Sequence, residues 1–316
     1  MAEDYDYESF YKEWNDENDF ISVHTSGSTG EPKEIKLSKR FMIGSARRTI
    51  DFFRLSSGSR LHSCVSPEFI GGKMMAVRAA ALNCNFTWEK PANRVLAKMA
   101  PKERITLLAV VPSQMLHILE NLNIMPVIDT IIVGGGPVNK TLKEKITASG
   151  LNVYETYGMT ETSSHIALRH ISGKEEWFRT LPGIKVNKNE KECLRIVFES
   201  GEVFETNDLV EVKDGETFKV IGRIDHVIIS GGKKINPAVV EEKISHLIEH
   251  RFIITGEADE KWGQKVILKI EGEENKESKG KLWGELKKLL PPYEMPKEIY
   301  YIRKLRATKN GKLIRN

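Results

Sequence analysis

Short apolar segments alternate with helical patterns through the first half of this chain, and this alternation constrains the fold more than any other feature. Apolar, strand-like segments occupy residues 20–24, 61–67, 104–114, 130–138 and 151–162, and each of the last three ends in a proline, glycine or polar turn. Helical patterns lie between them at residues 38–54, 71–82 and 141–149. Strands that alternate with helices predict an α/β fold with a mostly parallel sheet.

After Lys185 the alternation of strands and helices gives way to a series of short strand-like segments. Short strand-like segments such as CLRIVF, EVFET, LVEV and TFKVIG predict a small, antiparallel, β-rich subdomain. A helix that begins at a proline is predicted over residues 237–249, and further strands surround a helix near 276–290. We therefore expect a large domain at residues 1–224 and a small, mobile α+β domain at residues 225–316.

Composition excludes several classes of protein. The 316 residues are 40% hydrophobic and 29% charged, as in a soluble globular enzyme. The net charge of +4 is too small to indicate a nucleic-acid partner, and no apolar run approaches the ~20 residues of a membrane span. The acidic N-terminus does not resemble a signal peptide, and an acidic segment at residues 4–19 predicts a short helix that docks through Phe10, Tyr11 and Trp14.

The cysteines and the charge leave other properties open. Cys64, Cys84 and Cys193 are scattered, odd in number and without the spacing of a metal motif, which favours a reducing cytoplasm and no disulfide framework. The sequence does not fix the oligomeric state, and a homodimer is compatible with it.

One hydroxyl-rich and glycine-rich stretch, HTSGSTGEPKEI at residues 24–35, has the composition of a phosphate-binding loop. Glycines allow close approach of the backbone, hydroxyls and amides donate to phosphate oxygens, and Lys33 adds a positive charge. Gly27 and Gly30 are three residues apart and Lys33 follows a proline, so the stretch does not match G-x-x-x-x-G-K-[ST]. A flexible surface loop is the alternative.

Three further groups of residues have side chains suited to a nucleotide. Tyr157 to Glu161 read YGMTE and lie where a strand is expected to end, which is where ligands bind in open α/β sheets. Asp208 and the segment 222–225 offer an acid for ribose hydroxyls, and Lys312 lies close to the C-terminus. Taken singly, each of these groups is also explained by ordinary solvent-exposed or turn residues without a role in binding.

Taken together, TSGSTGEPK, YGMTE, TND, GRIDHVIISGGKKINPAVVEEKI and ATKNGKLIR resemble the successive core motifs of the adenylate-forming superfamily. That superfamily contains acyl-CoA synthetases, nonribosomal adenylation domains and luciferases. The resemblance extends from about residue 20 to the end, and it implies ATP, Mg²⁺ and coenzyme A as ligands.

The resemblance also implies roles for single residues. The ATP phosphates would be held by the first loop: Thr25, Ser26, Gly27, Ser28, Thr29, Gly30 and Lys33. Adenine would be enclosed by Gly134, Gly135, Gly136, Tyr157 and Gly158. Thr160 would contact the α-phosphate, Glu161 would hold Mg²⁺, and Asp208 would bind the ribose with Arg223 nearby. Lys312 would bridge the carboxylate and the α-phosphate. Rotation about a hinge at Asp225 would then replace Lys312 by the loop Ser230, Gly231 and Gly232.

The chain departs from the family pattern in four places. Asn207 replaces a glycine beside the ribose aspartate, and His226 replaces an acid after the hinge. The expected aromatic-histidine motif reads PEFI at residues 67–70. Members of the family usually carry a long segment ahead of the phosphate loop, and the Met-Ala start and the aromatic helix favour a naturally short form.

The segments GGKMMAVRA and TETSSHIALR most resemble those of o-succinylbenzoate–CoA ligases of menaquinone biosynthesis. The substrate of these ligases has a second, non-reacting carboxylate, and the resemblance implies that Arg78 binds it, since a planar guanidinium suits a carboxylate. Ser163, Ser164 and His165 would line the same pocket, whereas Lys73, at the helix start, is expected to face solvent. A surface arginine and a structural histidine remain the alternatives.

Three other functions stay open from the sequence. The acid can be a different acyl or aryl acid, such as phenylacetate or a fatty acid. The chain can be an adenylation domain that loads a separate carrier protein. A non-catalytic AMP-binding module is disfavoured by Lys33, Glu161 and Lys312.

Overall fold

The computed structural model describes residues 5–24, 34–307 and 313–315. The chain divides into two compact units, one of Met1–Lys185 with Val197–Phe204 and the other of Val186–Ile196 with Glu205–Asn316. The boundary expected between residues 224 and 225 falls inside the second unit, within the short helix η2 (Ile224–His226). The mobility of residues 225–316 stays a prediction.

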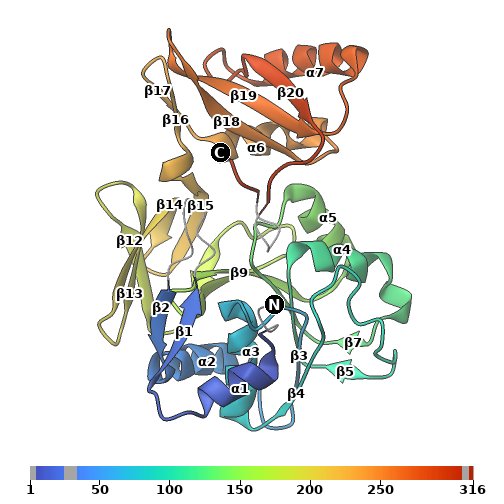
Figure 1. Ribbon diagram of the computed structural model, residues 1–316, viewed down its shortest axis with the longest axis vertical. Coiled ribbons are helices and arrows are strands. Elements are labelled where there is room, and N and C mark those ends of the chain that lie inside the picture. The colour runs from blue at the N-terminus through green and yellow to red at the C-terminus, as the bar shows by residue number, and fades with distance from the viewer. Residues whose placement is uncertain (1–4, 25–33, 308–312, 316) are drawn as a thin grey trace. The chain divides into compact units, whose positions relative to one another are not determined.

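The first unit carries the alternating strands and helices that the sequence predicts (Figure 1). Its helices are α1 (Tyr7–Trp14), α2 (Lys39–Phe53), α3 (Ile70–Leu82), α4 (Pro112–Glu120), η1 (Leu122–Ile124) and α5 (Lys140–Ser149). Its strands are β1 (Phe20–His24), β2 (Glu34–Ser38), β3 (Arg60–Ser63), β4 (Asn85–Trp88), β5 (Arg104–Ile105), β6 (Leu107–Val110), β7 (Val127–Ile128), β8 (Ile131–Val133), β9 (Val153–Met159), β10 (Ser164–His170) and β11 (Phe178–Thr180).

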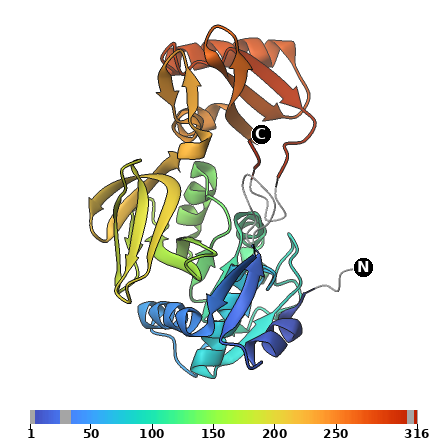
Figure 2. The same cartoon turned by 60° about the vertical axis from the view of Figure 1, so that its left-hand side comes forward.

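The main sheet of this unit is mixed, with the order β11-β10-β9-β8-β6-β3-β4. Strands β4, β3, β6, β8 and β9 pair in parallel, and β9, β10 and β11 pair antiparallel. The parallel core confirms the predicted α/β class, and the antiparallel pairing begins where β9 turns back into β10. Strands β1 and β2 form a separate antiparallel ribbon, shown in blue in Figure 2.

Helices cover both faces of the parallel strands. Alternate residues of one strand enter different cores: Leu108 and Val110 pack with α4 and α5, whereas Leu107 and Ala109 pack with α3. This period of two follows from the pleat of a strand. It explains why the parallel strands read as continuous apolar runs rather than as alternating ones.

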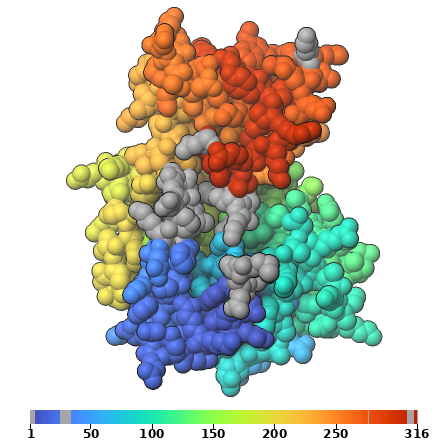
Figure 3. All heavy atoms as spheres, in the orientation of Figure 1, coloured from blue at the N-terminus to red at the C-terminus, as the bar shows by residue number. Residues whose placement is uncertain are grey.

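The N-terminal helix α1 is part of the first unit's core. Tyr7 and Phe10 are buried against α3 and the β1–β2 ribbon, with Tyr11 and Trp14 partly buried beside them. The docking through aromatic side chains is therefore confirmed, with Tyr7 as an additional anchor. In the space-filling view, blue residues of the N-terminal region lie on the face toward the reader (Figure 3).

The sequence predicts a turn at Pro112, but helix α4 begins there. Proline at the first position of a helix costs no hydrogen bond, since that N–H has no intrahelical partner. The Gln114 side chain accepts a hydrogen bond from the Val111 N–H (2.9 Å) and closes this N-terminus. None of the helices in the described ranges has the length and apolar content of a membrane span.

The second unit is rich in antiparallel strands. The chain first forms β12 (Ile184–Lys188), β13 (Cys193–Phe198), β14 (Val203–Asp214), β15 (Thr217–Arg223) and η2 (Ile224–His226). A five-stranded sheet follows, with the order β17-β16-β19-β18 and with β20 beside β19. Its elements are β16 (Ile228–Ser230), β17 (Lys233–Ile235), α6 (Pro237–Ile244), η3 (Ser245–Leu247), β18 (Phe252–Asp259), β19 (Gly263–Glu271), α7 (Lys276–Leu289) and β20 (Glu298–Ile302). Apolar residues of α6, α7 and this sheet share one core.

Candidate active site

The carboxyl ends of the parallel strands gather the sequence motifs of the first unit at one edge of the sheet. Gly134, Gly135 and Gly136 follow β8 directly, and Thr160 and Glu161 follow β9. This edge is where ligands bind in open parallel sheets. Tyr157, Gly158 and Met159 are the last residues of β9 and pair with β10, so the YGMTE motif lies at the end of a strand, as the sequence predicts.

The turn between β9 and β10 has a strained backbone. Ser163 and Ser164 have φ values of 53° and 87°, in a region that residues with a side chain rarely adopt. The Ser45 hydroxyl donates to the Ser163 carbonyl (2.9 Å) and holds the turn against α2. A Cβ at Gly158 would lie 2.2 Å from the Ser164 carbonyl oxygen, so only glycine fits there. Strain of this kind persists at functional sites.

The side chains at the sheet edge are accessible to a ligand. Tyr157 is half-buried and packs against Phe178, with ring centroids 5.8 Å apart. Thr160 and Glu161 are half-buried, and within the described part of the chain no hydrogen bond engages the Glu161 carboxylate. Carboxylate oxygens are the ligands that Mg²⁺ prefers, so Glu161 has the chemistry and the accessibility to hold it.

Arg78 lies in the middle of α3 and is 1% exposed. Its Nη1 is 3.8 Å from the Met75 sulfur, and its Nε and Nη2 are buried without a hydrogen-bond partner among the described residues. Burial lowers the pKa of Arg78 to about 9, which leaves the guanidinium charged at neutral pH. The alternative of a surface arginine is therefore wrong, and the described structure contains a buried cation without a counter-ion.

His165 lies close enough to Arg78 to be affected by its charge. Burial, together with the charge of Arg78, holds the pKa of His165 well below its usual range, so the imidazole is neutral at physiological pH. Its Nε2 is 2.9 Å from the Thr49 hydroxyl on α2. The Ser163 hydroxyl is also buried and unpartnered among the described residues. The neutral imidazole of His165 therefore brings no negative charge to Arg78.

Lys73 does not face solvent, contrary to the expectation from the sequence. It is 3% exposed, and its Nζ lies 3.8 Å from the centroid of the Tyr5 ring and 3.9 Å from a Glu13 carboxylate oxygen. Burial lowers its pKa to about 8. Both partners come from the N-terminal region, far away in the sequence, which is why the position of Lys73 on α3 gave no indication of them.

In the second unit, Arg223 joins two of the predicted residues. Its Nη1 donates to Asp208 (3.2 Å), and its Nε and Nη2 donate to Asp225 (2.9 and 2.6 Å). Burial alone would raise the pKa of Asp225, but the hydrogen bonds and the charge of Arg223 lower it. Arg223 is thus beside Asp208, as the sequence implied. The nucleotide and hinge roles of these residues stay predictions.

Ser230 ends β16, and Gly231 and Gly232 form the turn to β17. The two glycines have φ values of 55° and 75°, as a two-residue hairpin turn requires. The predicted phosphate-loop residues Thr25, Ser26, Gly27, Ser28, Thr29, Gly30 and Lys33 lie outside the described residues, and so does Lys312. Strands β1 and β2 flank the loop on either side.

Comparisons with known proteins identify the family. A family model described as AMP-binding enzyme matches residues 2–204. This chain belongs to the AMP-binding enzyme family. A crystal structure of an AMP-forming acyl-CoA synthetase/AMP-acid ligase II-like protein from Dyadobacter fermentans is 35% identical, with a TM-score of 0.63 over 96% of this chain and 90% of that one. Within the family, the chain is an AMP-forming acid–CoA ligase.

Two further relatives are more distant. The 2-succinylbenzoate–CoA ligase of Listeria monocytogenes is 26% identical over 99% of this chain and 72% of its own length. The o-succinylbenzoate CoA synthetase of Bacillus subtilis, solved with its acyl-adenylate intermediate, has a TM-score of 0.82 at 22% identity, over 93% of this chain and 68% of that one. The latter establishes the shared fold and the predicted fold class.

The unpaired state of Arg78 predicts an unusual response to mutation. Arg78→Met should raise the thermal unfolding midpoint of the ligand-free protein, because an apolar side chain of similar length removes an uncompensated buried charge. Replacing buried ionic groups by apolar ones stabilises other proteins by about 1–4 kcal/mol. Calorimetry of the purified variants measures this.

Lys73→Met is the matched control, since Lys73 is a buried cation on the same helix but has Tyr5 and Glu13 as partners. It should not raise the midpoint. If Arg78→Met proves as destabilising as Lys73→Met, Arg78 is compensated in the folded protein and the interpretation is wrong.

Proposed function

We propose that this acid–CoA ligase activates a dicarboxylic aromatic acid, with o-succinylbenzoate as the substrate. The observation that supports this most directly is the buried guanidinium of Arg78, which lacks a counter-ion among the described residues. An unpaired buried charge costs several kcal/mol, and a substrate carboxylate would offset that cost on binding. His165, which feels the charge of Arg78, is neutral and therefore does not compensate it.

The reaction has two steps. The reacting carboxylate attacks the α-phosphorus of ATP, pyrophosphate leaves, and an acyl-adenylate forms. The thiol of coenzyme A then attacks the acyl carbon, loses its proton and displaces AMP, which leaves the thioester. Both reactants of the first step are anions, so cationic groups at that point lower the barrier by stabilising the charge of the transition state.

Different residues of this chain would bind the metal ion, the nucleotide and the reacting groups. When bound, Mg²⁺ would neutralise phosphate charge, and Glu161 would be the carboxylate that holds it. Tyr157 would stack on adenine beside the glycines after β8, and Asp208 would accept from the ribose hydroxyls. Lys312 would place its ammonium between the carboxylate and the α-phosphate, a role that rests on the family resemblance. The cytoplasmic location favoured by the unpaired cysteines is likewise a proposal.

The identity of the acid can be tested by ATP–pyrophosphate exchange with o-succinylbenzoate, benzoate, phenylacetate and fatty acids, followed by coupling to coenzyme A. We expect exchange and thioester formation with o-succinylbenzoate, and much weaker exchange with acids that lack the second carboxylate. Preference for a monocarboxylic acid would contradict the dicarboxylate proposal. Exchange without thioester formation would indicate a domain that loads a carrier protein.

Arg78→Ala should raise KM for o-succinylbenzoate and leave KM for ATP and coenzyme A nearly unchanged. Removing one member of a buried charged pair costs about 2–5 kcal/mol, or about 30- to 5000-fold. Monocarboxylic analogues should be poor substrates of the wild type, and the Arg78→Ala substitution should reduce their turnover little further. Arg47→Ala, an exposed arginine on α2, is the control and should leave all three KM values unchanged. Normal use of the diacid by Arg78→Ala would remove Arg78 from the substrate site.

Lys312→Ala should separate the half-reactions. Adenylation should fall by about 10²- to 10³-fold, because a cation at the transition state is lost, while a supplied acyl-adenylate should still be converted to the thioester. Single-turnover assays of each step measure this, with the exposed Lys304→Ala as control. Equal losses in both steps would show that Lys312 acts elsewhere.

A further inference from the structure

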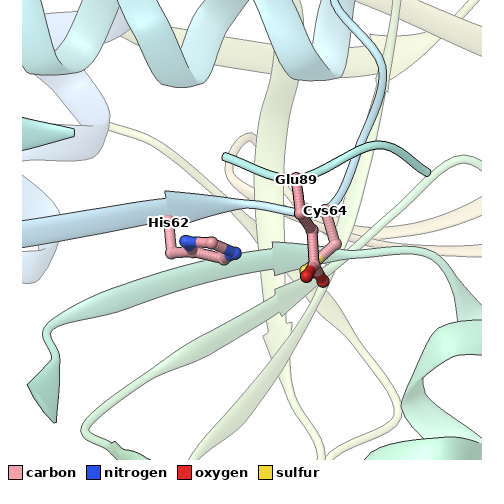
Figure 4. Close-up of side chains that lie close together, drawn as sticks. All are labelled: His62, Cys64 and Glu89. Atoms are coloured by element: carbon pink, nitrogen blue, oxygen red, sulfur yellow. The ribbon is translucent and has the colours of Figure 1, made fainter. Parts of the chain in front are cut away.

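A second group of polar side chains lies at the ends of strands β3 and β4, and the proposed reaction does not use it. His62 is on β3, Cys64 follows β3 directly, and Glu89 follows β4. One ligand atom of each residue lies within 4.8 Å of the other two. Figure 4 shows the far end of the His62 ring directed toward the Glu89 carboxylate, beside which the Cys64 sulfur lies.

His62 has a buried nitrogen without a partner. The side chain is 4% exposed, and its Nδ1 is 2.7 Å from the Thr87 hydroxyl on the neighbouring strand. Its Nε2 is buried and has no hydrogen-bond partner among the described residues. An unsatisfied buried polar group costs about 1–3 kcal/mol. If Nδ1 donates its proton to Thr87, the lone pair of Nε2 is free to bind a cation, and Thr87 fixes that tautomer.

Cys64 and Glu89 already share one hydrogen bond. The Cys64 thiol donates to a Glu89 oxygen at 3.2 Å, and the Leu96 N–H donates to the same oxygen at 2.8 Å. Cys64 is fully buried, whereas Glu89 is half-buried in the loop after β4, which gives an ion a route from solvent. A sulfur and an oxygen at this separation can bind one ion together.

We propose that His62, Cys64 and Glu89 bind one Zn²⁺ ion at the carboxyl ends of β3 and β4. Imidazole nitrogen, thiolate and carboxylate are the ligands that zinc takes in proteins. With bonds of about 2.0–2.3 Å, tetrahedral zinc would draw the three ligand atoms to within about 4 Å of one another, a small adjustment for the loop that carries Glu89. Water fills the fourth position.

The charges of this set match a divalent ion. Binding releases the thiol proton to solvent, so that the thiolate and the carboxylate each contribute one negative charge and Zn²⁺ cancels both. The resulting site is neutral, as burial favours. The ion would join the ends of β3 and β4. The Gln114 amide strengthens the same region, because it donates to the Cys64 carbonyl at 2.8 Å.

Cobalt is the probe for this site, because a thiolate–Co²⁺ bond absorbs in the near ultraviolet and identifies the cysteine ligand. Chelator-treated, reduced full-length protein is titrated with Co²⁺ without oxygen, and Zn²⁺ is then added. We expect saturation at one Co²⁺ per chain, loss of the absorption when Zn²⁺ displaces Co²⁺, and a raised thermal midpoint with Zn²⁺.

Variants assign the ligands. Cys64→Ser should lose the charge-transfer absorption, and His62→Ala and Glu89→Gln should weaken Co²⁺ binding. Thr87→Val, which leaves every ligand in place, should weaken it by about 10- to 100-fold. Cys84→Ser and Cys193→Ser are controls that should bind like wild type. Circular dichroism checks that each variant folds. If the substitutions of the buried residues His62 and Cys64 prevent folding, Glu89→Gln and Thr87→Val still test the site.

Absence of the absorption in wild-type protein at millimolar Co²⁺ would overturn the proposal, and so would unchanged absorption in folded Cys64→Ser. The experiment contains no acid, ATP or coenzyme A. Its outcome is therefore independent of whether o-succinylbenzoate is the substrate.

Discussion

Parallel pairing of β3, β4, β6, β8 and β9 is the constraint on which the candidate site depends. It brings the carboxyl ends of strands that are far apart in the sequence to one edge of the sheet. The glycines after β8 and the Thr160–Glu161 turn after β9 meet there, although neither motif alone indicates a site. The zinc ligands that we propose come from the same edge, at the ends of β3 and β4.

Desolvation explains how such a site can select an acid. Arg78 is enclosed by helix α3 and its neighbours, and a neutral His165 leaves the positive charge uncompensated. The unpaired charge destabilises the ligand-free protein, and a bound carboxylate removes this destabilisation. A substrate that lacks the second carboxylate leaves the guanidinium unpaired, so the same charge that favours one acid disfavours others.

The sequence predicted the α/β class, the strand–helix alternation and the motifs, because period and turn chemistry are local properties. It did not predict α4, because a proline just after an apolar strand indicates a turn, whereas Pro112 is the first residue of the helix. The burial of Arg78 and Lys73 could not be predicted, because every residue of α3 from Gly72 to Ala79 is buried, so this stretch of the helix has no polar face. His62, Cys64 and Glu89 meet only through the pairing of β3 with β4, so their spacing matches no motif.

A crystal structure with a non-hydrolysable o-succinylbenzoyl-adenylate analogue tests the role of Arg78 most directly. We expect the non-reacting carboxylate within about 2.7–2.9 Å of the Arg78 guanidinium, or joined to it through one ordered water. A complex in which the adenylate is bound while the guanidinium contacts neither the carboxylate nor a bridging water would contradict the assignment of Arg78 and the dicarboxylate specificity derived from it.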